Sequence, residues 1–320
     1  MRLSKYRTAA VPTFVVATIL LGAAIPARGE TCAGYPPELV PSGPLLAART
    51  FNSKLHLSVR IPSNGGPEPK YVGQTPSDGP PLRIPSCTIW YVTPNGDIST
   101  DALALEMQNQ SIPGLWLYRY GTDAMLAAVK DLKELQVLDL HGSEKVTDAG
   151  LVYLRGLTGL RSLDLLNTKV TDVGLANLKT LTGLRDLDLI MTGVTDAGLV
   201  YLKGLTGLQS LGLSETKVTD AGLKNLENLK GLQGLDLAET NVTDAGLAHL
   251  KGLTALKYLN LEHTKVTDAG LVYLKDLKAL RMLVLRRRAA VLDLCGDCVN
   301  VHDAAVASLR KALPDCEIRY

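Results

Sequence analysis

The densest group of reactive side chains in this sequence lies near its C-terminus. Cys295 and Cys298 are separated by two residues and His302 follows, a spacing that occurs in dithiol redox sites and among zinc ligands. A structural zinc site needs a complete tetrahedral set of protein ligands, and Cys316 is the one obvious further donor. Covalent haem attachment needs a histidine directly after the second cysteine, where this chain has Val299. We therefore predict no metal site and no cofactor.

The cysteines fit disulfide bonds better, provided that the chain reaches an oxidising compartment. The chain has 5 cysteines, and an odd number excludes complete pairing within one molecule. Cys316 would pair with either Cys295 or Cys298, and Cys32 would pair with Cys87, which leaves one thiol spare. A bond between Cys295 and Cys298 would instead restore the redox interpretation.

Little else in the sequence suggests catalysis. Arg286, Arg287 and Arg288 form a basic patch that could dock an acidic surface or a lipid headgroup, or could be the solvated edge of an insertion. The histidines lie on different segments without a nucleophile partner. We found no phosphate-binding glycine loop, no nucleophile elbow and no carboxylate pair suited to acid–base chemistry. We therefore predict no catalytic residues and no enzyme activity.

Residues 1–29 have the layout of a secretory signal peptide. Basic residues precede an uncharged, largely apolar segment at 8–26, and the small residues Ala27 and Gly29 suit a cleavage site. An uncleaved membrane anchor is the alternative, because the apolar segment approaches the roughly 20 residues that span a bilayer. The prolines that bound the segment and the small-residue site favour cleavage.

Charge and composition exclude two broad classes of protein. The formal net charge is +2, but residues 1–29 hold four basic and no acidic residues, so the chain after them has 30 basic and 32 acidic residues. This balance excludes a nucleic-acid binder that relies on bulk charge. A hydrophobic fraction of 46% excludes a disordered chain, and an aromatic fraction of only 5% indicates layers of aliphatic side chains.

One phrase repeats along the second half of the chain. The motif Val-Thr-Asp-x-Gly-Leu occurs six times at intervals of 24 residues. The sequence between its copies follows the pattern Leu-x-x-Leu-x-Leu-x-x-Thr-x-Val. The phrase starts at Val146, Val170, Val194, Val218, Val242 and Val266. A fixed period of this length indicates stacked repeats, none of which can bury its apolar face alone.

This pattern resembles the leucine-rich repeat, with threonine where that family usually has asparagine or cysteine. The phrase is similar to bacterial secreted leucine-rich repeat proteins and to the repeats of eukaryotic F-box proteins. The resemblance covers about residues 98–320 and implies an α/β fold: a curved solenoid with a parallel β-sheet on its concave face and short helices on its convex face. F-box relatives act as substrate receptors in ubiquitin ligases. We rank that function low for this chain, because it has an export signal and no evident F-box helices before its repeats.

Each repeat can be assigned local roles. Leu-x-Leu predicts a short strand with both leucines on one face. The threonines that follow, such as Thr168, are expected to stack and to bond backbone groups of the neighbouring coil. Thr-Asp predicts the start of a helix, capped by either residue, and the glycine after it predicts close packing between neighbouring helices.

These patterns divide the chain into four parts. Residues 1–29 are the signal peptide, and residues 30–97 hold 12 of the 16 prolines, with strand candidates at 55–61 and 87–92. That second part is either a partly ordered cap, which we favour, or a tether. Residues 98–285 carry the repeats. Residues 286–320 contain an insertion followed by a capping repeat with a terminal strand.

The concave face is the candidate binding surface, because curved solenoids present an extended surface there. Neighbouring strands lie about 4.8 Å apart, so Asp139, Asp164 and Asp188 are expected to form an acidic ladder that suits a cationic partner or a divalent ion. The alternative is that aspartate was copied with the repeat and faces water without a role. The full set of predicted partner-binding residues is Trp116, Asp139, Asp164, Asp188, Asp236, Tyr258 and Asn260.

The predicted function is therefore non-catalytic. We expect an exported leucine-rich repeat protein, located in the periplasm, on the cell surface or outside the cell, that binds another protein or envelope macromolecule through its concave face. The alternative is a structural protein of the cell envelope that residues 1–29 anchor because they are not cleaved. We expect no nucleic-acid partner, and contact with a membrane only if that segment is retained.

Overall fold

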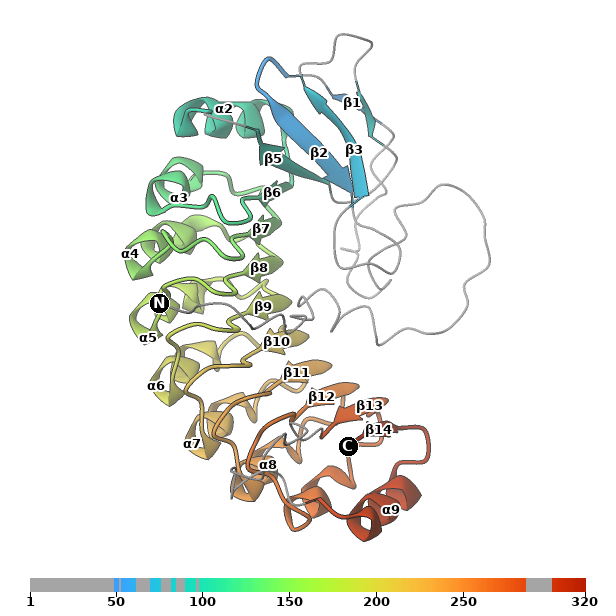
Figure 1. The fold of residues 1–320 in the computed structure, drawn as a ribbon. Coiled ribbons are helices and arrows are strands. Elements are labelled where there is room, and N and C mark those ends of the chain that lie inside the picture. Colours follow the sequence, from blue (N-terminus) through green and yellow to red (C-terminus); the bar gives the residue numbers. More distant parts are fainter. Residues whose placement is uncertain are drawn as a thin grey trace, which may run out of the picture.

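The computed structural model of the chain describes residues 49–51, 53–61, 70–75, 82–84, 90–95, 98–285 and 301–320. Figure 1 shows a curved solenoid in which each coil contributes one strand to the inner side of the curve and a short helical segment to the outer side. The predicted α/β solenoid with a concave parallel sheet and convex helices is confirmed.

A sheet of 12 strands, in the order β14-β13-β12-β11-β10-β9-β8-β7-β6-β5-β2-β3, runs through the described residues. From β5 to β14 every neighbouring pair is parallel. The parallel strands are β5 (Tyr91–Pro94), β6 (Gly114–Trp116), β7 (Val137–Asp139), β8 (Ser162–Asp164), β9 (Asp186–Asp188), β10 (Ser210–Gly212), β11 (Gly234–Asp236), β12 (Tyr258–Asn260), β13 (Met282–Val284) and β14 (Glu317–Arg319).

The convex side is built from short helices, because each coil leaves few residues between its strands. The α-helices are α2 (Thr100–Gln110), α3 (Asp123–Val129), α4 (Asp148–Leu151), α5 (Asp172–Leu175), α6 (Asp196–Leu199), α7 (Asp220–Leu223), α8 (Asp244–Leu250) and α9 (Asp303–Ala312). The 3-10 helices are η1 (Val152–Gly156), η2 (Leu178–Thr180), η3 (Val200–Leu202), η4 (Lys224–Leu226) and η5 (Gly270–Leu274).

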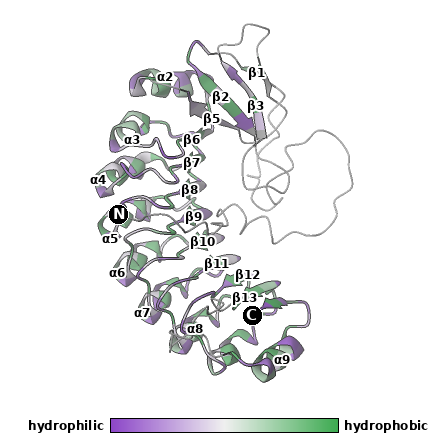
Figure 2. Cartoon of the chain, in the orientation of Figure 1, coloured by the Kyte–Doolittle hydropathy of each residue, from purple (hydrophilic) through white to green (hydrophobic). Residues whose placement is uncertain are grey.

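The core consists of aliphatic layers between the sheet and the helices. In one coil, Leu163 and Leu165 point inward from the strand, and Leu175 and Leu178 point inward from the convex side, all at most 1% exposed. The same positions recur in every coil, and Figure 2 shows the alternation of apolar and polar residues that they produce. Burial of each leucine contributes about 2 kcal/mol, so the stacked layers are the main source of stability.

Antiparallel strands extend the sheet beyond the first coil. Strand β2 (Leu57–Ile61) pairs with β5 and with β3 (Lys70–Thr75), and both pairings are antiparallel. Strands β1 (Arg49–Phe51) and β4 (Leu82–Ile84) form a separate two-stranded sheet. Trp90 and Phe51 pack edge to face, with ring centroids 5.0 Å apart, and are at most 2% exposed.

Asp–Thr bridges link each coil to the next on the convex side. Asp196 accepts hydrogen bonds from the Thr219 backbone N–H at 2.7 Å and from the Thr219 hydroxyl at 2.6 Å. Thr219 in turn caps α7, because its Oγ1 accepts a hydrogen bond from the Ala221 N–H at 3.3 Å. The same bridge joins Asp123 to Thr147, Asp148 to Thr171, Asp172 to Thr195, Asp220 to Thr243 and Asp244 to Thr267.

The sequence allowed either threonine or aspartate to cap the helix, and these bridges show that the two residues have different roles. Threonine is the helix cap, and aspartate holds the threonine of the following coil. The bridge also accounts for the glycine, since a Cβ on Gly222 would overlap the Asp196 carboxylate. The turn threonines differ from expectation: the Thr168 hydroxyl donates to the Leu165 carbonyl of its own coil at 2.7 Å. The two residues are only three positions apart, so the local bond forms in place of one to the neighbouring coil.

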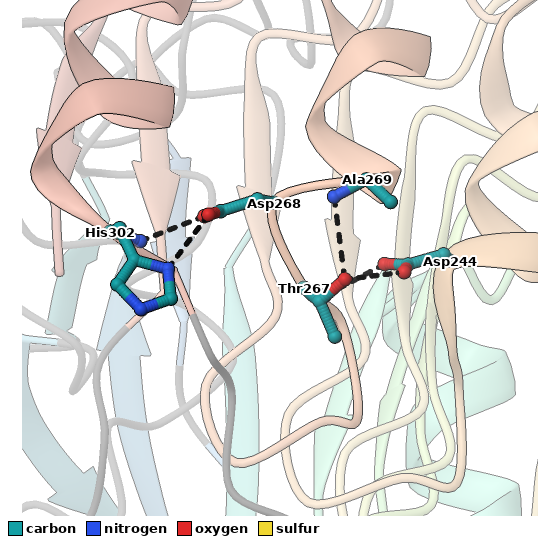
Figure 3. Close-up of polar contacts among 5 residues, drawn as sticks. All are labelled: Asp244, Thr267, Asp268, Ala269 and His302. Carbon is teal, nitrogen blue, oxygen red and sulfur yellow. Dashed lines mark hydrogen bonds and ion pairs between the residues drawn. The ribbon is translucent and has the colours of Figure 1, made fainter.

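The final coil uses a histidine in place of threonine, as Figure 3 shows. His302 donates its backbone N–H to Asp268 at 2.7 Å, and its Nδ1 lies 2.7 Å from the second Asp268 oxygen. The His302 backbone N–H is the main cause that holds the pKa of Asp268 below its usual value. The lowered pKa means that this bond stabilises the fold above pH 3.8, the ordinary value, and is lost as the pH falls further.

Removing this last bridge is expected to loosen the C-terminal helix. In Asp268→Asn the amide keeps one acceptor but loses the charge, so the bonds to His302 weaken. We expect amide hydrogens of α9 to exchange a few-fold faster at neutral pH, as measured by hydrogen–deuterium exchange and mass spectrometry. The matched control is Asp131→Asn, an exposed change in an early coil. Equal exchange of α9 in both variants would show that the bridge does not hold the helix.

Candidate functional site

Each coil turns sharply directly after its concave strand. Asp164 accepts a hydrogen bond from the Leu166 backbone N–H at 2.9 Å, and Asn167 then adopts a left-handed conformation with φ of 52°. The same backbone bond follows Asp139, Asp188, Asp236 and Asn260, at 2.8 to 3.0 Å. The aspartates therefore have a local structural role, because an acceptor at this position closes the turn.

The sheet brings the predicted aspartates together in register. Asp139 pairs with Asp164, and Asp164 pairs with Asp188. Gly212 follows, and then Asp236 pairs with Asn260. The position of Gly212 has no room for a larger residue, since an added Cβ would lie 2.6 Å from Asp188 Oδ1.

These aspartates are much less exposed than a water-facing ladder would be. Asp139, Asp164, Asp188 and Asp236 are between 3% and 8% exposed. Burial raises the pKa of Asp164 and of Asp236 to about 6, against an ordinary value of 3.8. Burial, and then the charge of Asp164, raise the pKa of Asp139 and of Asp188 well above the ordinary value. The interpretation that these groups face water is therefore wrong, because the closely spaced strands and the turns bury them.

A column of exposed residues runs along the edge of the concave face, at the left-handed position of each turn. Arg119, Asn167, Met191, Glu215 and Glu239 have φ between 52° and 64° and are exposed. This column was not predicted, since Gly142 is the one glycine among the left-handed positions of the described residues. For Asn167, Met191 and Glu239 the usable signal was an aspartate three residues earlier, whose side chain closes the turn.

The C-terminal end of the concave face is apolar. Tyr258, Met282 and Val284 form a buried cluster, between 5% and 8% exposed. Arg319 lies beside Val284 in the next strand. Burial is the main cause that raises the pKa of the Tyr258 hydroxyl. Two of the predicted binding residues, Tyr258 and Asn260, therefore lie on β12, far along the sheet from Trp116 on β6.

Several predicted residues lie outside the described part of the chain. These are the basic patch of Arg286, Arg287 and Arg288, and the cysteines Cys32, Cys87, Cys295 and Cys298. Cys316 is described and is 8% exposed, with its thiol 3.7 Å from the Glu317 carbonyl. Burial is the main cause that raises the pKa of this thiol to about 11. The disulfides stay predictions.

The described residues contain neither a candidate metal site nor a candidate membrane-spanning helix. No group of three or more His, Cys, Asp or Glu side chains in the described segments is arranged to hold a metal ion. None of the described helices has the length and apolar character needed to cross a membrane.

Comparison with known proteins adds to this geometry. The family model described as leucine rich repeat matches residues 206–266. The chain contains leucine-rich repeats. Among solved structures, the leucine-rich repeat solenoid is similar to internalin C2 of Listeria monocytogenes, with 27% identity, a TM-score of 0.51, and coverage of 62% of this chain and 80% of that protein.

A second similar structure shows the same fold. It is another internalin of Listeria monocytogenes, with 20% identity, a TM-score of 0.52, and coverage of 72% of this chain and 66% of that protein. A comparison with curated protein sequences gave no significant match. These likenesses support the resemblance to bacterial leucine-rich repeat proteins, which commonly bind other proteins.

Proposed function

We propose that this chain is an exported, non-catalytic leucine-rich repeat protein that binds a protein partner through its concave face. The observation that carries the proposal is the register of the parallel sheet. Side chains from eight successive coils stand in columns on one continuous curved surface, from Trp116 on β6 to Val284 on β13. Solenoids use such surfaces for recognition.

The variation along these columns supports the proposal. The frame leucines are the same in every coil, whereas the residue that follows the second strand leucine changes between Tyr118, His141, Leu166, Ile190 and Glu262. A surface that combines aromatic, aliphatic and charged groups suits one shape and charge pattern in a partner. Export is supported by the signal-peptide layout of residues 1–29, and N-terminal sequencing of the secreted chain would test it.

Site-specific photo-crosslinking would test the binding face. A photoreactive phenylalanine analogue at Met191, which is 41% exposed at the edge of the concave face, is expected to capture the partner. The same analogue at Val173, which is 71% exposed on convex helix α5, is the matched control and should capture little. Captured proteins would be identified by mass spectrometry. Equal capture at both positions, or capture at Val173 alone, would contradict the concave-face proposal.

Once a partner is captured, the acidic ladder can be tested separately. Replacing Asp139, Asp164 and Asp188 together with asparagine keeps each turn acceptor but removes the charges. If the ladder attracts a cationic partner, the affinity is expected to fall by about tenfold or more, as measured by calorimetry. Unchanged affinity would show that these aspartates serve only the turns.

A further inference from the structure

Aromatic and arginine side chains gather where the antiparallel strands meet the first coils. The Arg60 guanidinium carbon lies 4.5 Å from the centroid of the Trp116 ring and 5.9 Å from that of Tyr71. Arg119 lies 5.8 Å from the Tyr118 ring, and the Trp116 and Tyr118 ring centroids are 6.1 Å apart. We call Arg60, Tyr71, Trp116, Tyr118 and Arg119 the aromatic–arginine patch.

The strand register explains how the patch is assembled. Arg60 on β2 pairs with Tyr91 on β5, and Tyr91 pairs with Gly114 on β6. Gly114 has no side chain, and a Cβ there would lie 2.7 Å from the Tyr91 ring. The Tyr91 ring therefore packs over Gly114, and Trp116, two residues further on, packs against Tyr91 and Val137. Three of the five patch residues thus stand on paired strands, which hold a binding surface more rigidly than loops do.

The patch is accessible and cationic. Tyr71 is 51% exposed and Tyr118 is 40% exposed, and Arg119 is also exposed. Within the part of the chain that the structure describes, no carboxylate forms an ion pair with Arg119. His141, whose ring is 5.0 Å from that of Tyr118, has its pKa lowered by burial and then by the charge of Arg119. The exposed positive charge of the patch is therefore that of Arg119.

The inner columns of the neighbouring coils differ from this surface. Asp164 and Leu166 are 8% and 4% exposed, and Asp188 and Ile190 are similarly buried. The inner columns of these coils are therefore buried, whereas the aromatic–arginine patch exposes large side chains together with the positive charge of Arg119. Tyrosine, tryptophan and arginine are the residue types that most often dominate binding energy at protein interfaces.

We propose that the aromatic–arginine patch docks an acidic segment of a protein partner. Carboxylates of that segment would form bidentate hydrogen bonds with the Arg119 guanidinium, since this geometry matches a carboxylate. A neighbouring aromatic or aliphatic side chain of the segment would pack on the rings of Tyr118 and Tyr71. This inference rests on the proposed function, and it adds the chemistry of the partner and the end of the solenoid that the partner contacts.

Peptide selection with the full exported chain would test the proposal even while the partner is unidentified. The probe is a phage-displayed library of random linear peptides, followed by affinity measurements on the enriched peptides. We expect enriched peptides to be acidic, each with at least one aromatic or large aliphatic residue. Arg119→Glu is expected to weaken their binding by about tenfold or more. The matched control is Lys203→Glu, the same charge reversal at an exposed convex position, which should leave binding unchanged.

The other outcomes are decisive. Neutral or basic enriched peptides, or acidic peptides that bind the Arg119→Glu and Lys203→Glu variants equally well, would overturn the docking of an acidic segment. If such peptides nevertheless cross-link at Met191 and not at Val173, the concave-face function would survive. If the library gives no binders, while vesicles of phosphatidylcholine and phosphatidylserine bind the chain in an Arg119-dependent manner, the patch is a membrane contact and the proposal is wrong. Circular dichroism of both variants would confirm that each is folded.

Discussion

Gly222→Ala is expected to destabilise the solenoid by about 3 kcal/mol, although the change adds a single methyl group. The added Cβ would overlap Asp196 Oδ1 and lie 3.1 Å from Leu199 Cδ1. To make room, the carboxylate must move away from Thr219, and two charge-assisted hydrogen bonds weaken together. Urea unfolding followed by circular dichroism would measure the change in the free energy of unfolding.

Two further variants separate this cause from the ordinary effect of alanine. Gly204→Ala is the matched control, because no atom lies within 4 Å of its added Cβ, and it should be neutral or slightly stabilising. Asp196→Ala is itself expected to cost about 3 kcal/mol, since it removes both bonds to Thr219. In that background Gly222→Ala should cost much less than in the wild type, because the overlap has gone. Equal costs of Gly222→Ala in the two backgrounds would contradict the bridge as the cause.

The buried aspartates of the concave face are expected to make the protein more stable in mild acid than at neutral pH. Burial raises their pKa values in the folded state, to about 6 for Asp164 and Asp236. Between the ordinary value of 3.8 and these values the folded chain binds protons that the unfolded chain does not. The stabilisation is therefore complete below pH 4 and is lost as the pH rises through about 6.

Asp236→Asn would test this directly. The asparagine can still accept the Ala238 N–H, but it carries no charge to desolvate. We expect the variant to be more stable than the wild type at pH 8, by up to about 3 kcal/mol, and to match it near pH 4. Denaturant unfolding across this pH range is the measurement, with exposed Asp276→Asn as the control. A stability difference that does not change with pH would show that burial does not raise the pKa of Asp236.

The period of the sequence was sufficient to predict the fold. Leucines such as Leu163 and Leu165 recur at fixed positions, and stacking is the one arrangement that buries all of them. The helical phrase Thr-Asp was likewise readable as a start signal. The bridge from Asp196 to Thr219 was not, because it joins residues 23 apart through the stacking of two coils, and a capping role within one helix explains the same residue types.

The candidate binding surface was only partly predictable. The columns of the concave face follow from strand alternation, so Asp139, Asp164 and Asp188 were placed correctly. Their burial depends on how closely neighbouring strands and turns approach, which no single repeat reveals. The aromatic–arginine patch could not be foreseen either. Strands were predicted at 55–61 and 87–92, but the sequence did not indicate the antiparallel pairing that brings Arg60 to Trp116.

The Asp–Thr bridges have a consequence for how such a chain can change over generations. From Val146 to Val266 every unit has the same length, and each aspartate meets a threonine that all the other units also supply. Recombination between two units within this stretch would therefore delete or duplicate a whole coil while leaving compatible partners at the new joint. A single genetic event can therefore add one strand to the concave sheet or remove one from it. The unit closed by His302 differs from the others and cannot be exchanged with them in this way.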